Sequence, residues 1–121
     1  MASVCVADDD RDLRMIYSAC LRADGHQVDE AADGAEALCA VRDRSPSLLL
    51  LDLRMPGLDG FEVLEAMRNA EWGTRTKVIV LSAAVDADSR LRAYGVGAAD
   101  VLVKGLPLAE LRASVRRALE P

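Results

Sequence analysis

The sequence predicts an α/β fold in which five consecutive β-α units, a (βα)5 arrangement, form a three-layer α/β/α sandwich around a five-stranded parallel sheet. Short apolar runs alternate with longer runs of helical periodicity along the whole chain of 121 residues. Three of the apolar runs contain almost no polar residues, which is typical of strands that helices cover on both faces. The length and the 51% content of hydrophobic residues indicate one globular domain, residues 1–121.

The five apolar runs are the predicted strands, and the second is the weakest of them. They are Val4–Ala7, Val28–Ala32, Leu48–Leu51, Val78–Leu81 and Val101–Val103. Strands joined by helices run parallel, and in such sheets ligands bind beyond the carboxyl ends of the strands. The residues that directly follow each strand are therefore the first candidates for function.

Capping signals mark the five predicted helices. The first helix ends near Gly25 and carries an apolar stripe made of Leu13, Ile16, Tyr17, Cys20 and Leu21. The second and third open with the capping-box spacing, at Asp33–Glu36 and Asp59–Glu62. The fourth covers about residues 87–94 with Asp86 as its cap, and the fifth begins near Pro107.

Composition excludes several classes of protein. Twenty acidic residues against 15 basic ones give a net charge of -5, which argues against nucleic-acid binding and suits a pocket that holds a cation. The three cysteines show no C-x-x-C spacing, so we interpret all three as small apolar side chains in a reducing compartment. Membrane spans, a signal peptide and a Gly-rich nucleotide loop are not found. These features predict a cytoplasmic protein.

Polar residues follow four of the five predicted strands. Three consecutive acids (Asp8, Asp9 and Asp10) follow the first strand, Asp52 follows the third, Ser82 and Ala83 follow the fourth, and Lys104 follows the fifth. Each of them also has an ordinary structural interpretation, because Asp caps helices and a lysine at a strand end is commonly solvated. Asp52 is the exception, since it directly follows four leucines, where an unpartnered acid is costly.

Carboxylates that converge on one sheet edge repel one another and need a cation. Mg²⁺ prefers oxygen ligands and binds through a few carboxylates and waters. A carboxylate beside Mg²⁺ can attack a phosphoryl group, and an ammonium and a hydroxyl can bond the phosphoryl oxygens. This inventory predicts Mg²⁺-dependent phosphoryl transfer onto an aspartate.

These residues resemble the receiver domain of two-component response regulators, over essentially the whole chain. The segment from Leu51 to Gly60 is similar to the one around that family's phospho-acceptor aspartate. The acids Asp8 and Asp9, the pair Ser82–Ala83, and Lys104 follow in the family's order. The resemblance implies a flavodoxin-like fold with strand order 2-1-3-4-5.

The resemblance also implies a role for each matching residue. Asp52 looks like the phosphorylated residue, Asp9 like a direct Mg²⁺ ligand and Asp8 like an acid that reaches the ion through water. Asp52 itself and the Arg54 carbonyl match further metal ligands. The implied phosphate donor is a phosphohistidine on a sensor histidine kinase or a phosphotransfer protein.

Around the phosphoryl group the resemblance implies four further contacts. Ser82 matches the switch hydroxyl, Lys104 the phosphate-pairing lysine, and the Ala83 N–H bonds a phosphoryl oxygen. The Arg54 side chain overhangs the site, and we hypothesise that it changes the lifetime of the phosphorylated state. The domain itself would catalyse transfer and hydrolysis, although it is primarily a signalling switch.

Three positions depart from the family's pattern, and Arg54, two residues after Asp52, is one of them. Many members have a cis Lys-Pro bond where this chain has Lys104-Gly105, which predicts a trans bond here. An aromatic residue that moves inward on activation is replaced by Val101, so the output mechanism differs. A pseudo-receiver that signals without phosphate therefore stays open, as does an unrelated phosphohydrolase with Asp8 as its nucleophile.

The fourth helix, fifth strand and fifth helix form the implied output face. It carries mixed charges, namely Arg90, Arg92, Asp100, Glu110, Arg112 and Arg116. The charges are either solvated or paired across a homodimer, because Arg92 and Asp100 match positions used in that way in one receiver subfamily. Whether the chain stands alone or is part of a longer protein is left open.

Overall fold

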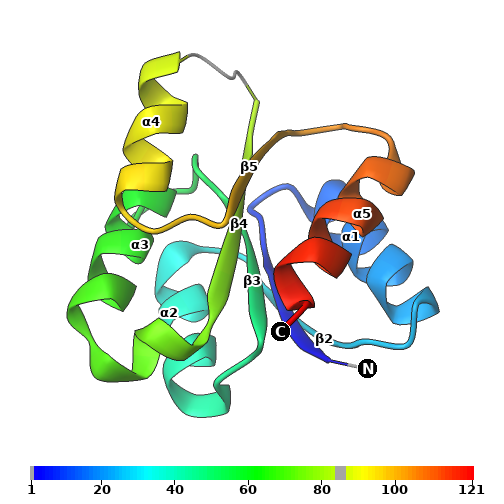
Figure 1. The fold of residues 1–121 in the computed structure, drawn as a ribbon, viewed down its shortest axis with the longest axis horizontal. Coiled ribbons are helices and arrows are strands. Elements are labelled where there is room, and N and C mark those ends of the chain that lie inside the picture. Colours follow the sequence, from blue (N-terminus) through cyan, green and yellow to red (C-terminus); the bar gives the residue numbers. More distant parts are fainter. Residues whose placement is uncertain (1, 84–86) are drawn as a thin grey trace.

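The computed structural model describes residues 2–83 and 87–121 (Figure 1). Five parallel strands form one sheet in the order β2-β1-β3-β4-β5. They are β1 (Ser3–Ala7), β2 (Gln27–Ala31), β3 (Leu48–Asp52), β4 (Lys77–Ser82) and β5 (Asp100–Val103). The predicted fold class and strand order are both confirmed.

Five α-helices and one 3-10 helix connect the strands. They are α1 (Arg11–Ala23), α2 (Gly34–Arg44), α3 (Gly60–Asn69), the 3-10 helix η1 (Glu71–Arg75), α4 (Ala87–Gly95) and α5 (Leu108–Leu119). In Figure 1 the sheet is seen nearly edge-on, with α1 and α5 on one side and α2, α3 and α4 on the other. These are the three predicted layers.

Two hydrophobic cores fill the space between the layers. Successive β3 side chains point to opposite faces, so Leu49 and Leu51 enter the core under α2 and α3, whereas Leu48 and Leu50 enter the core under α1 and α5. All five β3 residues are buried, as the unbroken apolar run predicts for a central strand. Asp52, the last residue of that strand, is therefore held in a rigid place.

Helix capping uses one of the three acids at the first strand end and leaves the other two for other roles. The Asp10 carboxylate accepts hydrogen bonds from the N–H groups of Asp12 and Leu13 and caps α1. Asp59 and Glu62 form the predicted capping box at the start of α3. Since Asp10 caps the helix, Asp9 does not have this structural task. Asp86, the predicted cap of α4, lies outside the described residues.

Two expectations about packing are wrong. Ile16 lies on the exposed side of α1 and Ser18 is buried instead, because the face that the helix turns to the sheet is rotated away from Ile16 and toward Ser18. Cys39 is exposed on α2, whereas Cys5 and Cys20 are buried as expected.

Among the described residues, no helix combines the length and the hydrophobicity that a membrane span requires.

Candidate functional site

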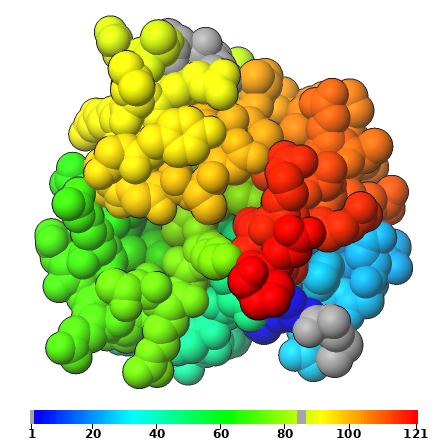
Figure 2. All heavy atoms as spheres, in the orientation of Figure 1, coloured from blue at the N-terminus to red at the C-terminus, as the bar shows by residue number. Residues whose placement is uncertain are grey.

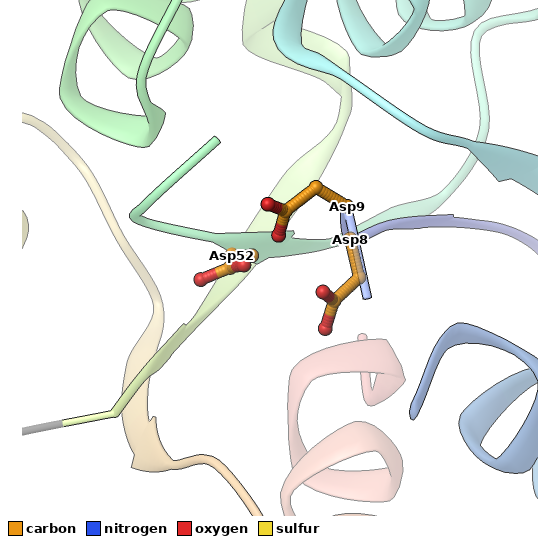
Figure 3. Close-up of side chains that lie close together, drawn as sticks. All are labelled: Asp8, Asp9 and Asp52. Atoms are coloured by element: carbon orange, nitrogen blue, oxygen red, sulfur yellow. The ribbon is translucent and has the colours of Figure 1, made fainter. Parts of the chain in front are cut away.

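Three carboxylates meet at the carboxyl edge of the sheet. Asp8 and Asp9 follow β1, and Asp52 ends β3, the neighbouring strand (Figure 3). One oxygen atom of each carboxylate lies within 4.8 Å of the other two. Asp8 and Asp52 are 0% and 2% exposed, whereas Asp9 is open to solvent. The β1–β3 register pairs Ala7 with Leu51, so the two buried acids come next in line on adjacent strands.

Lys104 bridges the two buried acids from the edge strand. Its Nζ lies 3.1 Å from Asp8 Oδ1 and 3.0 Å from Asp52 Oδ2. The backbone holds the lysine in this position, because the Lys104 N–H donates to the Ser82 carbonyl at 2.8 Å and so continues the β4–β5 pairing by one residue. The three sequence-distant residues thus form one connected group.

Burial dominates the electrostatics of Asp52. It raises the pKa of Asp52 to about 6 and the charge on Asp8 adds to the effect, while the Arg54 N–H and Lys104 act in the opposite direction. The Arg54 N–H donates to Asp52 Oδ1 at 3.1 Å. Burial disfavours the charge on Lys104, but hydrogen bonds and charges from Asp52 and Asp8 outweigh it and raise the lysine's pKa. The site is therefore short of positive charge.

One buried acceptor in this group is unsatisfied. Asp8 Oδ1 accepts from Lys104 and from the Asp10 N–H at 2.8 Å. Asp8 Oδ2 is buried and has no hydrogen-bond partner among the residues that the structure describes. Buried carboxylate oxygens are rarely left alone, and a divalent cation with oxygen ligands would satisfy this atom. The donor set of Asp8, Asp9 and Asp52 thus fits Mg²⁺.

An open pocket lies beside the carboxylate cluster and is lined by its exposed member, Asp9. Its wall includes Asp9, Arg54, Ser82, Ser89 and Arg92. Ser82 is almost completely buried at the end of β4, and Ala83, directly after it, is exposed. Arg54 is exposed on the pocket wall, in the loop between β3 and α3. All the predicted site residues therefore come from the same edge of the sheet.

Three supporting contacts were not predicted from the sequence. Arg14 donates from Nη1 to the Asp8 carbonyl at 2.7 Å, and the Tyr17 hydroxyl accepts a hydrogen bond from the Gly105 N–H at 3.0 Å. The Arg92 guanidinium lies 3.9 Å from the centre of the Phe61 ring. Spacing along the chain carries no signal for such pairs, because each joins two different elements.

The comparisons with known proteins agree with this geometry. The family model of the response regulator receiver domain matches residues 4–116. The transcriptional regulatory protein PrrA of Mycobacterium tuberculosis is 41% identical over 116 residues, which cover 96% of this chain and 49% of PrrA. The regulatory protein AtoC of Escherichia coli is 34% identical over 117 residues, 97% of this chain and 25% of AtoC. The chain spans half or less of these curated relatives.

Solved structures show the same likeness. The chemotaxis response regulator CheY4 of Vibrio cholerae superposes with a TM-score of 0.92 at 30% identity, over 98% of this chain and 99% of that one. The receiver domain of the Francisella response regulator 1452 has a TM-score of 0.90 at 28% identity, over 98% and 97%. The chain belongs to the response regulator receiver domain family, and it is a receiver domain of a two-component system.

Proposed function

We propose that this receiver domain accepts a phosphoryl group on Asp52 in a Mg²⁺-dependent reaction, from a phosphohistidine on a sensor histidine kinase or a phosphotransfer protein. One observation carries the proposal. A lysine ammonium bridges two buried carboxylates, and one oxygen of the Asp8 carboxylate has no hydrogen-bond partner within residues 2–83 and 87–121. Such a group has little structural purpose, because burying it is costly unless a ligand completes it.

The reaction exchanges one bond to phosphorus for another. A carboxylate oxygen of Asp52 attacks the phosphorus of the donor, a bond forms between them, and the bond from phosphorus to the donor's imidazole nitrogen breaks. The imidazole leaves with the electron pair and takes a proton, and Asp52 becomes a mixed anhydride. Hydrolysis by water later returns the carboxylate and releases inorganic phosphate.

Mg²⁺ would be held by Asp8, Asp9, Asp52 and the Arg54 carbonyl. When bound, the ion neutralises charge between the carboxylates and the incoming phosphoryl group. Lys104 is already within hydrogen-bond distance of Asp52, so its ammonium can move onto a phosphoryl oxygen without a change of fold. Ser82 and the Ala83 N–H, beside the same pocket, would bond the remaining oxygens.

Phosphorylation would change the surface formed by α4, β5 and α5, which adjoin one another in Figure 2. Val101 is buried at the start of β5 and cannot act as the missing aromatic switch. Movement of Ser82 would instead reach α4 through the pocket wall that it shares with Ser89 and Arg92. This route is part of the proposal.

A homodimer through this surface stays a prediction. Asp100 already accepts from Ser114 Oγ at 2.6 Å and from the Tyr94 hydroxyl at 3.2 Å, and lies 3.7 Å from Arg117. Arg92 lies over Phe61. A dimer would therefore have to exchange these contacts within the chain for contacts with the second copy.

A cytoplasmic location is likewise proposed, and nucleic-acid binding by this chain is not.

Intact mass spectrometry after treatment with acetyl phosphate and Mg²⁺ tests the function. We expect a gain of one phosphoryl group that disappears in Asp52→Asn and without metal. Asp43→Asn, which removes an exposed carboxylate at the end of α2, is the matched control and should keep the gain. No gain in folded wild-type protein would favour the pseudo-receiver, and a gain that persists in Asp52→Asn would point to Asp8 as the nucleophile.

A further inference from the structure

The loop after Lys104 is held by an unusual hydrogen bond. No peptide bond that the structure describes is cis, so the Lys104-Gly105 bond is trans, as predicted. Gly105 adopts a φ of +79°, a conformation that side chains with a Cβ rarely take, although a Cβ there would meet no atom within 4 Å. Glycine is thus required by the backbone conformation and not by space. Unlike a proline, it also brings an N–H that needs an acceptor.

The acceptor is a core side chain from a distant element. Tyr17 of α1 is only 1% exposed and packs in the core between α1, α5 and the sheet. Its hydroxyl oxygen accepts the Gly105 N–H at 3.0 Å, across 88 positions of sequence. A phenol that is otherwise surrounded by apolar side chains therefore places its one polar atom at the functional edge of the sheet.

These bonds enclose Lys104 on both sides. Its own N–H is held by the Ser82 carbonyl at 2.8 Å, and the N–H of the next residue is held by Tyr17. The Leu106 N–H returns to the Val103 carbonyl at 3.2 Å and closes the turn around the lysine. The direction of the side chain toward Asp8 and Asp52 is set by this short stretch of backbone.

We propose that Tyr17 is a positioning residue for Lys104. Its hydroxyl accepts a hydrogen bond from the Gly105 N–H and thereby fixes the lysine in this trans loop. The inference rests on the proposed phosphorylation of Asp52. Gly105 is exposed, so its N–H would turn to water if the hydroxyl were removed, and the loop would move with it. The Lys104 ammonium would then spend less time within reach of Asp52, where its attraction to the phosphoryl oxygens is needed.

Tyr17→Phe tests this role because it removes one oxygen atom and keeps the ring. With acetyl phosphate and Mg²⁺ we expect phosphorylation of Asp52 to slow by about three- to ten-fold, the worth of one hydrogen bond. In the Lys104→Ala background the same substitution should have no further effect, because it acts only through the lysine. Additive effects in that cycle would assign Tyr17 a general structural role and overturn the proposal.

Thr76→Val is the matched control for lost stability. Thr76 is also buried, and its hydroxyl donates to the Pro46 carbonyl at 2.7 Å, away from the functional edge, just before β4 begins. It should lower the unfolding midpoint as Tyr17→Phe does and leave the phosphorylation rate unchanged. A slowed rate in Thr76→Val would show that any buried hydroxyl has this effect.

Two further experiments test the hydrogen bond between Tyr17 and Gly105. In amide hydrogen exchange, the Gly105 N–H should be protected in the wild type and should exchange faster in Tyr17→Phe. Equal exchange rates in the two proteins would contradict the hydrogen bond. Gly105→Ala disturbs the loop from its own side and should slow phosphorylation without adding to Tyr17→Phe. Wild-type protein that is not phosphorylated would overturn the proposed function, whereas normal phosphorylation with no effect of Tyr17→Phe would overturn only this inference.

Discussion

The two ends of the sheet carry charge in different ways. At the carboxyl end, Asp8 and Asp52 are buried and share one ammonium. At the amino end, a broad groove between β4, α5 and the end of α1 is lined by Arg75, Lys77 and Arg112 among others. Both partners of the Arg112–Asp24 ion pair there are more than one-third exposed. Water screens the charges at the amino end strongly, whereas those at the carboxyl end are screened less and act on one another more strongly.

That difference is the physical reason why we place the proposed reaction at the carboxyl end. Exposed ion pairs change stability little, because solvation and attraction nearly cancel. Buried charges that are only partly compensated leave free energy that a ligand can use. Four substitutions measure this contrast, from the largest expected effect to the smallest.

Lys104→Ala should have the largest effect on stability. It leaves two buried carboxylates without their cation, so the free energy of unfolding at pH 7 should fall by about 3 kcal/mol without metal. Chemical denaturation in the presence of a chelator measures this value. Added Mg²⁺ should recover part of the loss. An unchanged unfolding free energy would mean that the carboxyl end is as well screened as the amino end.

Asp52→Asn should stabilise the metal-free protein by about 2 kcal/mol at pH 7. The folded-state pKa of Asp52 is about 6, against 3.8 for the free group, so the folded protein holds this proton more tightly than the unfolded chain does. The contribution of this protonated carboxyl to the free energy of unfolding is therefore fully present below about pH 4 and is lost as the pH rises through 6.

The stability gain of Asp52→Asn should accordingly appear between pH 4 and 6 and stay constant above this range. Urea denaturation of wild type and variant at several pH values traces the difference. Asp43→Asn, at an exposed pair, is the control and should show no such pH window. A gain that is the same at pH 3 and pH 7 would contradict burial as its cause.

Arg54→Ala separates position from burial, because this charge lies at the carboxyl end but is exposed. We expect little change in stability and a change of about two- to five-fold in the lifetime of phosphorylated Asp52, since Arg54 lines the pocket from which water would attack. Loss of the phosphoryl group over time, followed by intact mass, measures it. Equal lifetimes would remove Arg54 from the site.

Arg112→Ala should have the smallest effect. The pair with Asp24 has a nitrogen–oxygen distance of 3.1 Å, yet its exposure limits the change in unfolding free energy to about 0.5 kcal/mol. The phosphorylation rate should not change. Thermal unfolding in low and high salt provides the measurement, and a shift as large as that of Lys104→Ala would overturn the comparison of the two ends.

Much of the fold was predictable from the sequence because local signals and the fold agree. The four leucines before Asp52 predict a central strand, and β3 is buried throughout. The Asp59–Glu62 spacing predicts the start of α3, where both capping bonds are present. Ile16 was misplaced because helical spacing indicates a buried face only approximately and its exact direction depends on what packs against the helix, whereas Cys39 was misplaced because residue type alone does not fix burial.

The sequence alone determined which residues end the strands, and parallel strand geometry then requires Asp8, Asp9, Asp52, Ser82 and Lys104 to share one edge. Only the tertiary structure decided how they are connected: that Lys104 bridges two acids, that one Asp8 oxygen finds no partner in the described part of the chain, and that Tyr17 holds the loop beside the lysine. The physical reason is distance along the chain. Periodicity and capping act over a few residues, whereas burial, pKa and contacts between elements depend on side chains that meet only after folding.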